Sequence, residues 1–142
     1  MGLKPRGAKA KGDRYERELA QHFNEKVFDG KDVVFRAPLS GGGRNIGGGG
    51  QADLTGTPKV WIEAKRTERF QPYQAMEQAE KGIECSRCPD IPVVINRKSQ
   101  VKTDDSLVVM RLRDWLDMYS HYLKLTADKG DDKQTLLPVA SE

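Results

Sequence analysis

The first regular pattern of apolar and polar residues runs from residue 12 to residue 28. The apolar residues recur three and four positions apart, which predicts an amphipathic helix. They form one broad stripe at about 100° per residue and are Tyr15, Leu19, Ala20, Phe23 and Val27. Glu16 lies near the centre of this stripe, whereas Glu18 projects from the other side.

Glu16 is therefore an acidic residue on an otherwise apolar face. An inward carboxylate costs free energy unless another group compensates its charge. Alternatively, Glu16 stands in the first turn of the helix, where it reaches water and favours the positive helix end. We favour a functional role, because a second acidic cluster further along the chain also needs a partner.

Extended segments follow this helix. The segment 33–37 is typical of a strand that ends at Pro38. Residues 53–55 begin a strand that turns at 56–58 into another at 60–65, which predicts a hairpin. We expect further strands at 93–96 and 107–112.

Two more helices complete the pattern. One is predicted at 72–84, with a packing face of Tyr73, Met76, Ala79 and Ile83. Asp114 is placed to cap the last helix, whose apolar residues are Trp115, Leu116, Met118, Tyr119, Tyr122 and Leu123. The order of helix, three strands, helix, two strands and helix predicts an α/β fold with helices flanking a mixed sheet.

The chain of 142 residues is long enough for one domain. We predict a flexible basic arm at 1–11, a folded domain at 12–126 and a polar, disordered tail at 127–142. Hydrophobic residues make up 37% and charged residues 32%, which is typical of a soluble globular protein. No apolar run approaches the length of a membrane span, so we expect a cytoplasmic protein, or one in the host cytoplasm if it is viral.

The formal net charge of +3 does not by itself indicate an anionic partner. Its distribution is more suggestive, because basic residues crowd the first 14 positions and acidic residues gather in the tail. Basic arms bind nucleic acid, but a short basic terminus is equally often only solvated.

The glycine-rich segment 40–50 reads Ser-Gly-Gly-Gly-Arg-Asn-Ile-Gly-Gly-Gly-Gly. No Gly-Lys-Ser or Gly-Lys-Thr follows it, which excludes a Walker A loop. The loose dinucleotide pattern Gly47-x-Gly49-x-x-Ala52 precedes strand and turn residues rather than a helix, so we reject a dinucleotide site. We expect a mobile loop that closes on a substrate, with a plain linker as the alternative.

The strongest chemical signal is Asp-x9-Glu-x-Lys, formed by Asp53, Glu63 and Lys65. Side chains on a strand alternate between its faces. The side chains of Glu63 and Lys65 therefore share one face of an otherwise apolar strand. Buried charges persist when they are paired or hold a metal ion. With Asp53 arriving from the preceding segment, this set matches what a divalent-metal phosphodiesterase needs.

Mg²⁺ prefers carboxylate and water oxygens and takes only one or two protein carboxylates. Asp53 and Glu63 supply two, and the backbone carbonyl of Ala64 could add a third oxygen. Glu16 could reach the same ion through water or help hold a second one. Lys65 would lie beside the attacking water or the charge that develops on phosphorus. The alternative is an ordinary surface salt bridge between Glu63 and a neighbour.

Cys85 and Cys88 form a lone Cys-x-x-Cys pair, which is a weak signal for zinc or redox chemistry. We expect two reduced cysteines at a helix end, and a zinc-stabilised module is the less favoured reading.

Several motifs together resemble one nuclease superfamily. The segment 11–19, Lys-Gly-Asp-Arg-Tyr-Glu-Arg-Glu-Leu, matches an opening Lys-Gly-x-x-x-Glu-Arg-Glu-Leu whose first Glu is catalytic and corresponds to Glu16. Ala-Asp-Leu at 52–54 matches Pro-Asp-Leu, and Ile-Glu-Ala-Lys at 62–65 matches Ile-Glu-Val-Lys. These motifs resemble the PD-(D/E)xK superfamily, and within it the archaeal-type Holliday-junction resolvases and their phage relatives, over residues 11 to about 120.

The resemblance implies a restriction-endonuclease-like fold, a homodimer and DNA cleavage that depends on Mg²⁺, with Mn²⁺ also accepted. It places Ser40, from the segment 36–41, near the scissile phosphate. It also moves Gln78, which periodicity alone leaves on the helix surface, toward the active site. Recognition of a junction depends on backbone shape and phosphate charge, and the candidate phosphate contacts are Arg14, Arg36, Arg44, Arg66 and Arg69.

The leading hypothesis is therefore a structure-selective endonuclease that cuts four-way DNA junctions. A less selective phage or restriction-like endonuclease of the same fold is the alternative within this class. A non-catalytic DNA-binding module is the alternative outside it, and the intact set of Glu16, Asp53, Glu63 and Lys65 argues against that module.

Overall fold

The computed structural model describes residues 3–38 and 51–128. The chain divides into two compact units, Met1–Met110 and Arg111–Glu142. In chain order, the helices and strands are α1 (Leu3–Lys26), β1 (Phe35–Arg36), β2 (Leu54–Thr55), β3 (Val60–Lys65), α2 (Pro72–Ser86), β4 (Ile91–Asn96), the 3₁₀ helix η2 (Thr103–Asp105), β5 (Leu107–Val109) and α3 (Leu112–Asp128). The predicted α/β class and element order are confirmed.

Helix α1 begins earlier than the apolar pattern indicates. It starts at Leu3, so most of the predicted irregular arm at 1–11 is helical. The apolar stripe begins only at Tyr15, which explains why periodicity placed the helix start too late. Tyr15, Leu19 and Ala20 are buried as predicted. Val27 is 62% exposed and follows the end of the helix.

Asn24 fixes the path of the chain after α1. Its side-chain Oδ1 accepts hydrogen bonds from the N–H groups of Val33 and Val34, and its Nδ2 donates to the carbonyl of Val34. These bonds hold the returning segment against the helix, because buried backbone groups need partners. Strand β1 follows directly.

The strands form two small sheets. Strands β1 and β2 pair antiparallel, β3 pairs parallel with β4, and β4 pairs antiparallel with β5. The predicted hairpin between 53–55 and 60–65 is therefore wrong, because the ladder partner of β2 is β1. One backbone hydrogen bond, from Asp53 N–H to the Ile62 carbonyl at 2.9 Å, joins the β2 segment to β3.

Gly56 explains why β2 lies beside β1. Its φ is +88°, and a Cβ atom there would stand 2.0 Å from the Val33 carbonyl oxygen. Only glycine lacks this atom and adopts such a φ without strain. The turn after β2 therefore packs closely against the segment that leads into β1.

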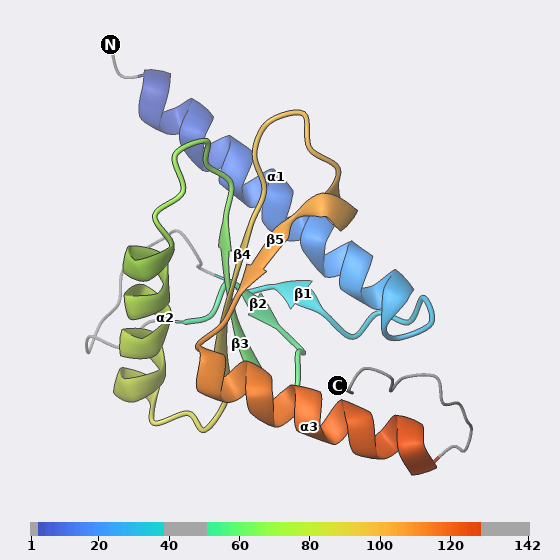
Figure 1. The fold of residues 1–142 in the computed structure, drawn as a ribbon. Coiled ribbons are helices and arrows are strands. Elements are labelled where there is room, and N and C mark those ends of the chain that lie inside the picture. Colours follow the sequence, from blue (N-terminus) through green and yellow to red (C-terminus); the bar gives the residue numbers. More distant parts are fainter. Residues whose placement is uncertain (1–2, 39–50, 129–142) are drawn as a thin grey trace. The chain divides into compact units, whose positions relative to one another are not determined.

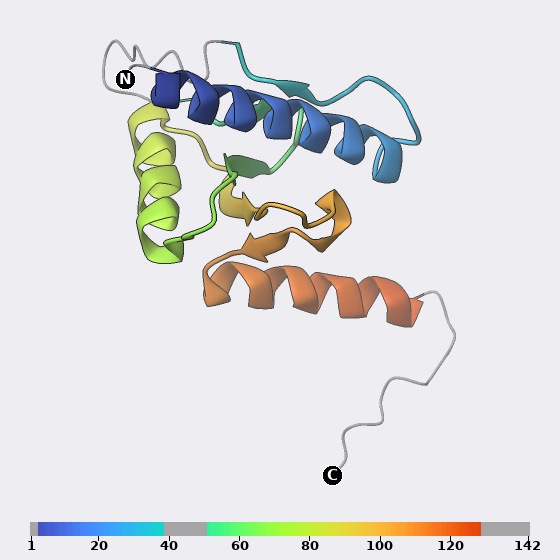
Figure 2. The same ribbon diagram turned by 90° about the horizontal axis from the view of Figure 1, so that it is seen from above.

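Helices α1 and α2 lie on different sides of β3 and β4 (Figures 1 and 2). On the α1 side, Ile62, Val93 and Ile95 pack with the buried α1 residues. On the α2 side, Trp61 and Val94 pack with Ala75, Met76 and Ala79. The predicted alternation along β3 is confirmed, because Trp61 and Ile62 belong to separate cores.

The packing face of α2 differs in part from the prediction. Tyr73 is 74% exposed, whereas Ala75 and Gly82 are buried. A Cβ at Gly82 would stand 2.6 Å from the Trp61 ring, so the indole lies directly against the helix backbone. Small residues on this face thus allow α2 to pack closely against Trp61. A pattern of large apolar residues does not reveal such a face.

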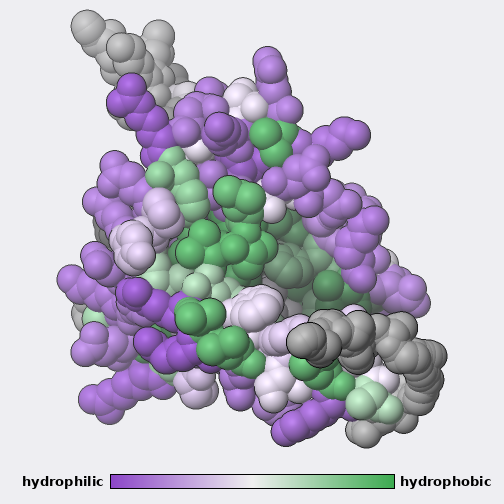
Figure 3. Space-filling view, in the orientation of Figure 1, coloured by the Kyte–Doolittle hydropathy of each residue, from purple (hydrophilic) through white to green (hydrophobic). Residues whose placement is uncertain are grey.

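Strand β5 borders an exposed apolar surface. Leu107 and Val108 are 62% and 59% exposed. Figure 3 shows hydrophobic residues gathered in the region where β5 runs in Figure 1. Strand β5 ends at Val109, three residues before the predicted end at 112, because Leu112 already begins α3.

The second unit contains helix α3. Asp114 lies within its first turn rather than at the predicted cap position, since the helix begins at Leu112. The helix reaches Asp128, so the predicted tail at 127–142 begins too early, and residues 129–142 lie outside the described residues. Trp115 and Tyr119 stack with ring centroids 4.9 Å apart. Among the helices of the described residues, none has the length and apolar character needed to span a membrane.

Candidate active site

Asp53 is held at the edge of β3 by two hydrogen bonds to the strand. Its N–H donates to the Ile62 carbonyl at 2.9 Å, and its Oδ2 accepts from the Ala64 N–H at 2.8 Å. The second bond places the Asp53 carboxylate beside the residue that separates Glu63 from Lys65. The sequence-predicted Asp53 and Glu63 therefore meet, although they do so without a hairpin ladder.

The two carboxyl groups are largely buried and repel one another. Burial and the negative charges of Glu63 and Glu16 together raise the pKa of Asp53 to about 7, against the opposing effects of the Ala64 N–H and Lys65. Burial also raises the pKa of Glu63, against the opposing effect of Lys65. Because Glu16 affects both pKa values, all three predicted acids lie within electrostatic range of one another.

Lys65 supplies the positive charge on this side of β3. Its Nζ lies 3.6 Å from Glu63 Oε2 and donates a 2.8 Å hydrogen bond to Gln78 Oε1. Gln78 comes from α2, so the helix that packs on Trp61 also places a partner for the lysine. The structure thus brings the predicted Gln78 to the predicted Lys65.

Trp61 lies on the same face of β3 as Glu63. Its indole N–H opposes the rise in the Glu63 pKa, so it lies near that carboxyl group. It does not reach hydrogen-bond geometry with any described residue, although the side chain is only 7% exposed. Strand alternation places Trp61, two residues before Glu63, on the face that carries Glu63 and Lys65.

Glu16 approaches the site from α1 and is paired with Arg36. Arg36 Nε donates to Glu16 Oε1 at 2.9 Å, and Arg36 Nη2 donates to Asp13 Oδ1 at 2.7 Å. The Glu16 side chain is 12% exposed. Asp13 was not among the predicted site residues, although it lies one helical turn before Glu16 and therefore on the same face of α1.

The donor groups fit a small, hard cation. Asp53 and Glu63 supply carboxylate oxygens, and a strand residue directs its N–H and its carbonyl to the same edge. Because the Ala64 N–H faces Asp53, its carbonyl faces that side as well. No group of three or more His, Cys, Asp or Glu side chains suited to a metal ion occurs in the described part of the chain. Two carboxylates with a carbonyl and water remain a common Mg²⁺ environment.

The predicted phosphate contacts have different surroundings. Ser40 and Arg44 lie outside the described residues. Arg14 and Arg69 are exposed, whereas the Arg66 side chain is only 14% exposed and lies 3.1 Å from Glu68. Arg36 is also largely enclosed by its acidic partners.

Asn96 is a further polar residue that sequence analysis missed. It is 3% exposed at the end of β4, opposite Lys65 in the strand register. Its Oδ1 has no hydrogen-bond partner in the described part of the chain. The available signal in the sequence was a polar residue at the end of an otherwise apolar strand.

The cysteines lie apart from this site, at the far end of α2. Both are free; Cys85 is exposed, and Cys88 packs partly against the Trp61 core. Comparisons with known protein families, with curated proteins and with solved structures each found no match.

Proposed function

We propose that this protein is a metal-dependent DNA endonuclease with a restriction-endonuclease-like fold that cuts four-way junctions. One observation carries the proposal: Asp53 and Glu63 form a largely buried carboxylate pair with raised pKa values at the edge of β3. Lys65 lies 3.6 Å from one of them. Acids with perturbed pKa values beside a lysine are typical of a functional site.

Each group has a distinct role in this proposal. Asp53, Glu63 and the Ala64 carbonyl would hold the cation. When bound there, Mg²⁺ or Mn²⁺ would supply positive charge to a phosphate oxygen and would lower the pKa of a water molecule. The Lys65 ammonium stabilises the negative charge that grows on the phosphate.

Two neighbouring residues position these groups. Gln78 fixes the Lys65 ammonium through the 2.8 Å hydrogen bond. Arg36 fixes Glu16, whose carboxylate adds negative charge beside the cation without leaving its ion pair.

Junction selectivity and a homodimer are supported by the sequence motifs. The segments 11–19 and 62–65 resemble those of Holliday-junction resolvases, and they contribute Glu16, Glu63 and Lys65 to the site. In a homodimer, two such sites would nick opposed strands of the junction.

The proposal is tested by incubating a fixed four-way junction and a linear duplex with the protein and Mg²⁺. Symmetric paired nicks confined to the junction are the expected result. Equal cutting of both substrates would instead indicate a less selective endonuclease.

A carboxylate variant separates catalysis from binding. Asp53→Asn should retain junction binding and lose cleavage, because it removes one charge that holds the cation. The exposed Asp32→Asn is the matched control and should cleave normally. If the wild-type protein binds the junction but cuts no substrate with any divalent cation, a non-catalytic binding module is the correct description.

A further inference from the structure

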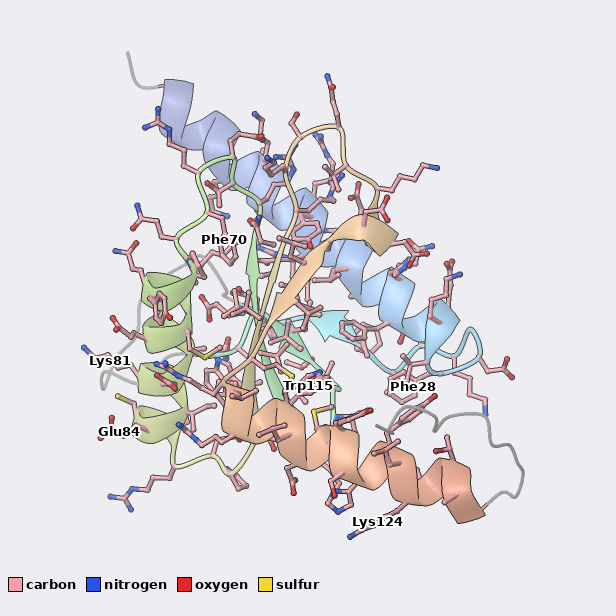
Figure 4. All side chains as sticks on the ribbon, in the orientation of Figure 1. Phe28, Phe70, Lys81, Glu84, Trp115 and Lys124 are labelled. Carbon is pink, nitrogen blue, oxygen red and sulfur yellow. The ribbon has the colours of Figure 1, made fainter. Side chains whose placement is uncertain are left out.

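A surface pocket adjoins the candidate active site on the α2 side of β3. It has a volume of about 230 Å³, and its polar lining residues are Lys65, Thr67, Arg69, Gln71, Gln74 and Gln78. Figure 4 shows Phe70 at the end of α2 where the chain enters the helix. The pocket shares Lys65 and Gln78 with the active site, so the two sites are continuous.

The described lining residues give the pocket a positive charge. Lys65 and Arg69 are cationic, four residues offer amide or hydroxyl groups, and none of these lining residues is acidic. The nearest acid in sequence, Glu68, is engaged elsewhere: its Oε2 lies 3.1 Å from Arg66 Nη1 and accepts a 2.8 Å hydrogen bond from Ser99 N–H. No described carboxylate pairs with Arg69, whereas Arg36 and Arg66 both have acidic partners.

The start of α2 adds hydrogen-bond donors to the same pocket. Gln71 occupies the N-cap position, but its side chain makes no capping hydrogen bond. Pro72 has no N–H and the Ala75 N–H donates to the Gln71 carbonyl, so the first-turn N–H groups without an acceptor within the helix are those of Tyr73 and Gln74. A guanidinium, an ammonium and such N–H groups together suit a phosphate oxygen better than a base edge.

We propose that this pocket binds a phosphodiester group of the cleaved strand next to the scissile phosphate. The inference rests on the proposed nuclease function, because Lys65 is assigned to the scissile phosphate there. Arg69 is the principal contact, and Gln71 and Gln74 donate to the remaining oxygens. The pocket then sets the register of the strand across Asp53 and Glu63.

The test measures junction binding in the Asp53→Asn background, where the substrate stays intact. Arg69→Ala should weaken binding about tenfold at low salt and reduce the slope of log affinity against log salt by about one. Gln74→Glu places a carboxylate in the pocket and should weaken binding at least as much. Lys81→Ala is the control, since it removes a positive charge further along α2, away from Phe70 (Figure 4).

Neutral backbone linkages in the DNA can identify which phosphate occupies the pocket. Single phosphates near the cleavage position are replaced by methylphosphonates. At one position, adjacent to the cut, the replacement should lower the junction affinity of the protein with Arg69 but not that of the Arg69→Ala variant. If Arg69→Ala and Gln74→Glu bind the junction as tightly as Lys81→Ala does, while the wild-type protein still cuts junctions, the pocket inference is wrong and the nuclease function stands. If no DNA binds at all, both proposals fail.

A strand end could also provide a phosphate group. Junctions built with a strand end at the cleavage position, with or without a terminal phosphate there, should bind equally, because the proposed ligand is an internal diester. An affinity gain that depends on the terminal phosphate and on Arg69 would overturn the diester assignment.

Discussion

Two groups of acidic residues lie within electrostatic range of each other, and their charges are balanced differently. Asp13 and Glu16 share Arg36, with contacts of 2.7 and 2.9 Å. The pKa of Asp13 is lowered, by a hydrogen bond from Lys9 and by the charge of Arg36, against the effect of burial. In the other group, Glu63 has Lys65 at 3.6 Å, and the pKa values of both Asp53 and Glu63 are raised.

In the proposed nuclease, the difference separates acids that are paired within the protein from acids that would hold the cation. The acids around Arg36 are neutralised within the protein, so they stabilise the contact between α1 and β1. The acids at the edge of β3 retain surplus negative charge in a buried place, which disfavours the folded state. A bound cation would remove this repulsion, which supports the cation site that we propose here.

The largest effect should come from removing the surplus charge at Glu63. Glu63→Gln keeps the size of the side chain but removes one charge that holds the cation. We expect cleavage to fall about a thousandfold or more, as for the loss of a preorganised electrostatic group, while junction binding remains. Single-turnover cleavage assays with Mg²⁺ measure the rate, and the exposed Glu77→Gln provides the control. A Glu63→Gln rate within tenfold of wild type would remove Glu63 from the catalytic site.

The repulsion itself should be visible in the stability of the metal-free protein. A pKa raised from 3.8 to about 7 means that folded Asp53 binds its proton more tightly than unfolded Asp53. The resulting penalty is absent below pH 4, grows as the pH rises and is complete above pH 7, where it reaches at most about 4 kcal/mol. Asp53→Asn can still accept the Ala64 N–H without the charge, so it should be more stable than wild type at pH 8.

Urea denaturation in the presence of a chelator measures this difference. The gain in unfolding free energy should shrink steadily from pH 8 to pH 4, and Asp32→Asn should show no such trend. Adding Mg²⁺ at pH 8 should narrow the gap, because the cation stabilises the wild-type site. A gain that is independent of pH would show that charge repulsion is not its cause.

Removing Arg36 should convert the balanced acidic group into an unbalanced one. Arg36→Ala leaves Asp13 and Glu16 without this partner and should lower the unfolding free energy by about 2 kcal/mol at pH 7. In the wild type the lowered pKa of Asp13 contributes stability above pH 4 that is lost as the pH falls. The deficit of Arg36→Ala should therefore be smaller at pH 3.5, as urea denaturation can determine. Arg14→Ala, which removes an exposed charge from the same helix, should change stability little at either pH.

The sequence predicted the elements of this fold better than their pairing. Strand β3 has the predicted bounds, and its two faces separate as the alternation indicated. The partner of β2 was not predictable from local pattern, because Gly56 and Asn24 direct the chain through contacts with distant backbone. The early start of α1 was also hidden, since its first turns carry no apolar stripe.

The sequence predicted the acids and the lysine of the candidate site, but not how their charges are balanced by neighbouring residues. Asp53, Glu63, Lys65 and Gln78 come together as the motifs indicated. Arg36 was predicted only as a phosphate contact, and the sequence did not indicate that two of its nitrogens donate to Asp13 and Glu16. Which acid receives the arginine depends on the packing of α1 against β1, and this packing leaves no local signature in the sequence.

The smallest effect should come from loosening Lys65 while leaving every charge in place. Gln78→Ala removes the acceptor of the 2.8 Å hydrogen bond, so the ammonium samples more positions. Loss of an exposed hydrogen bond of about 1 kcal/mol should lower kcat about fivefold and leave KM nearly unchanged. Gln21→Ala, an exposed glutamine of α1, is the control for steady-state cleavage assays. A rise in KM with unchanged kcat would indicate instead that Gln78 contacts the substrate rather than positioning Lys65.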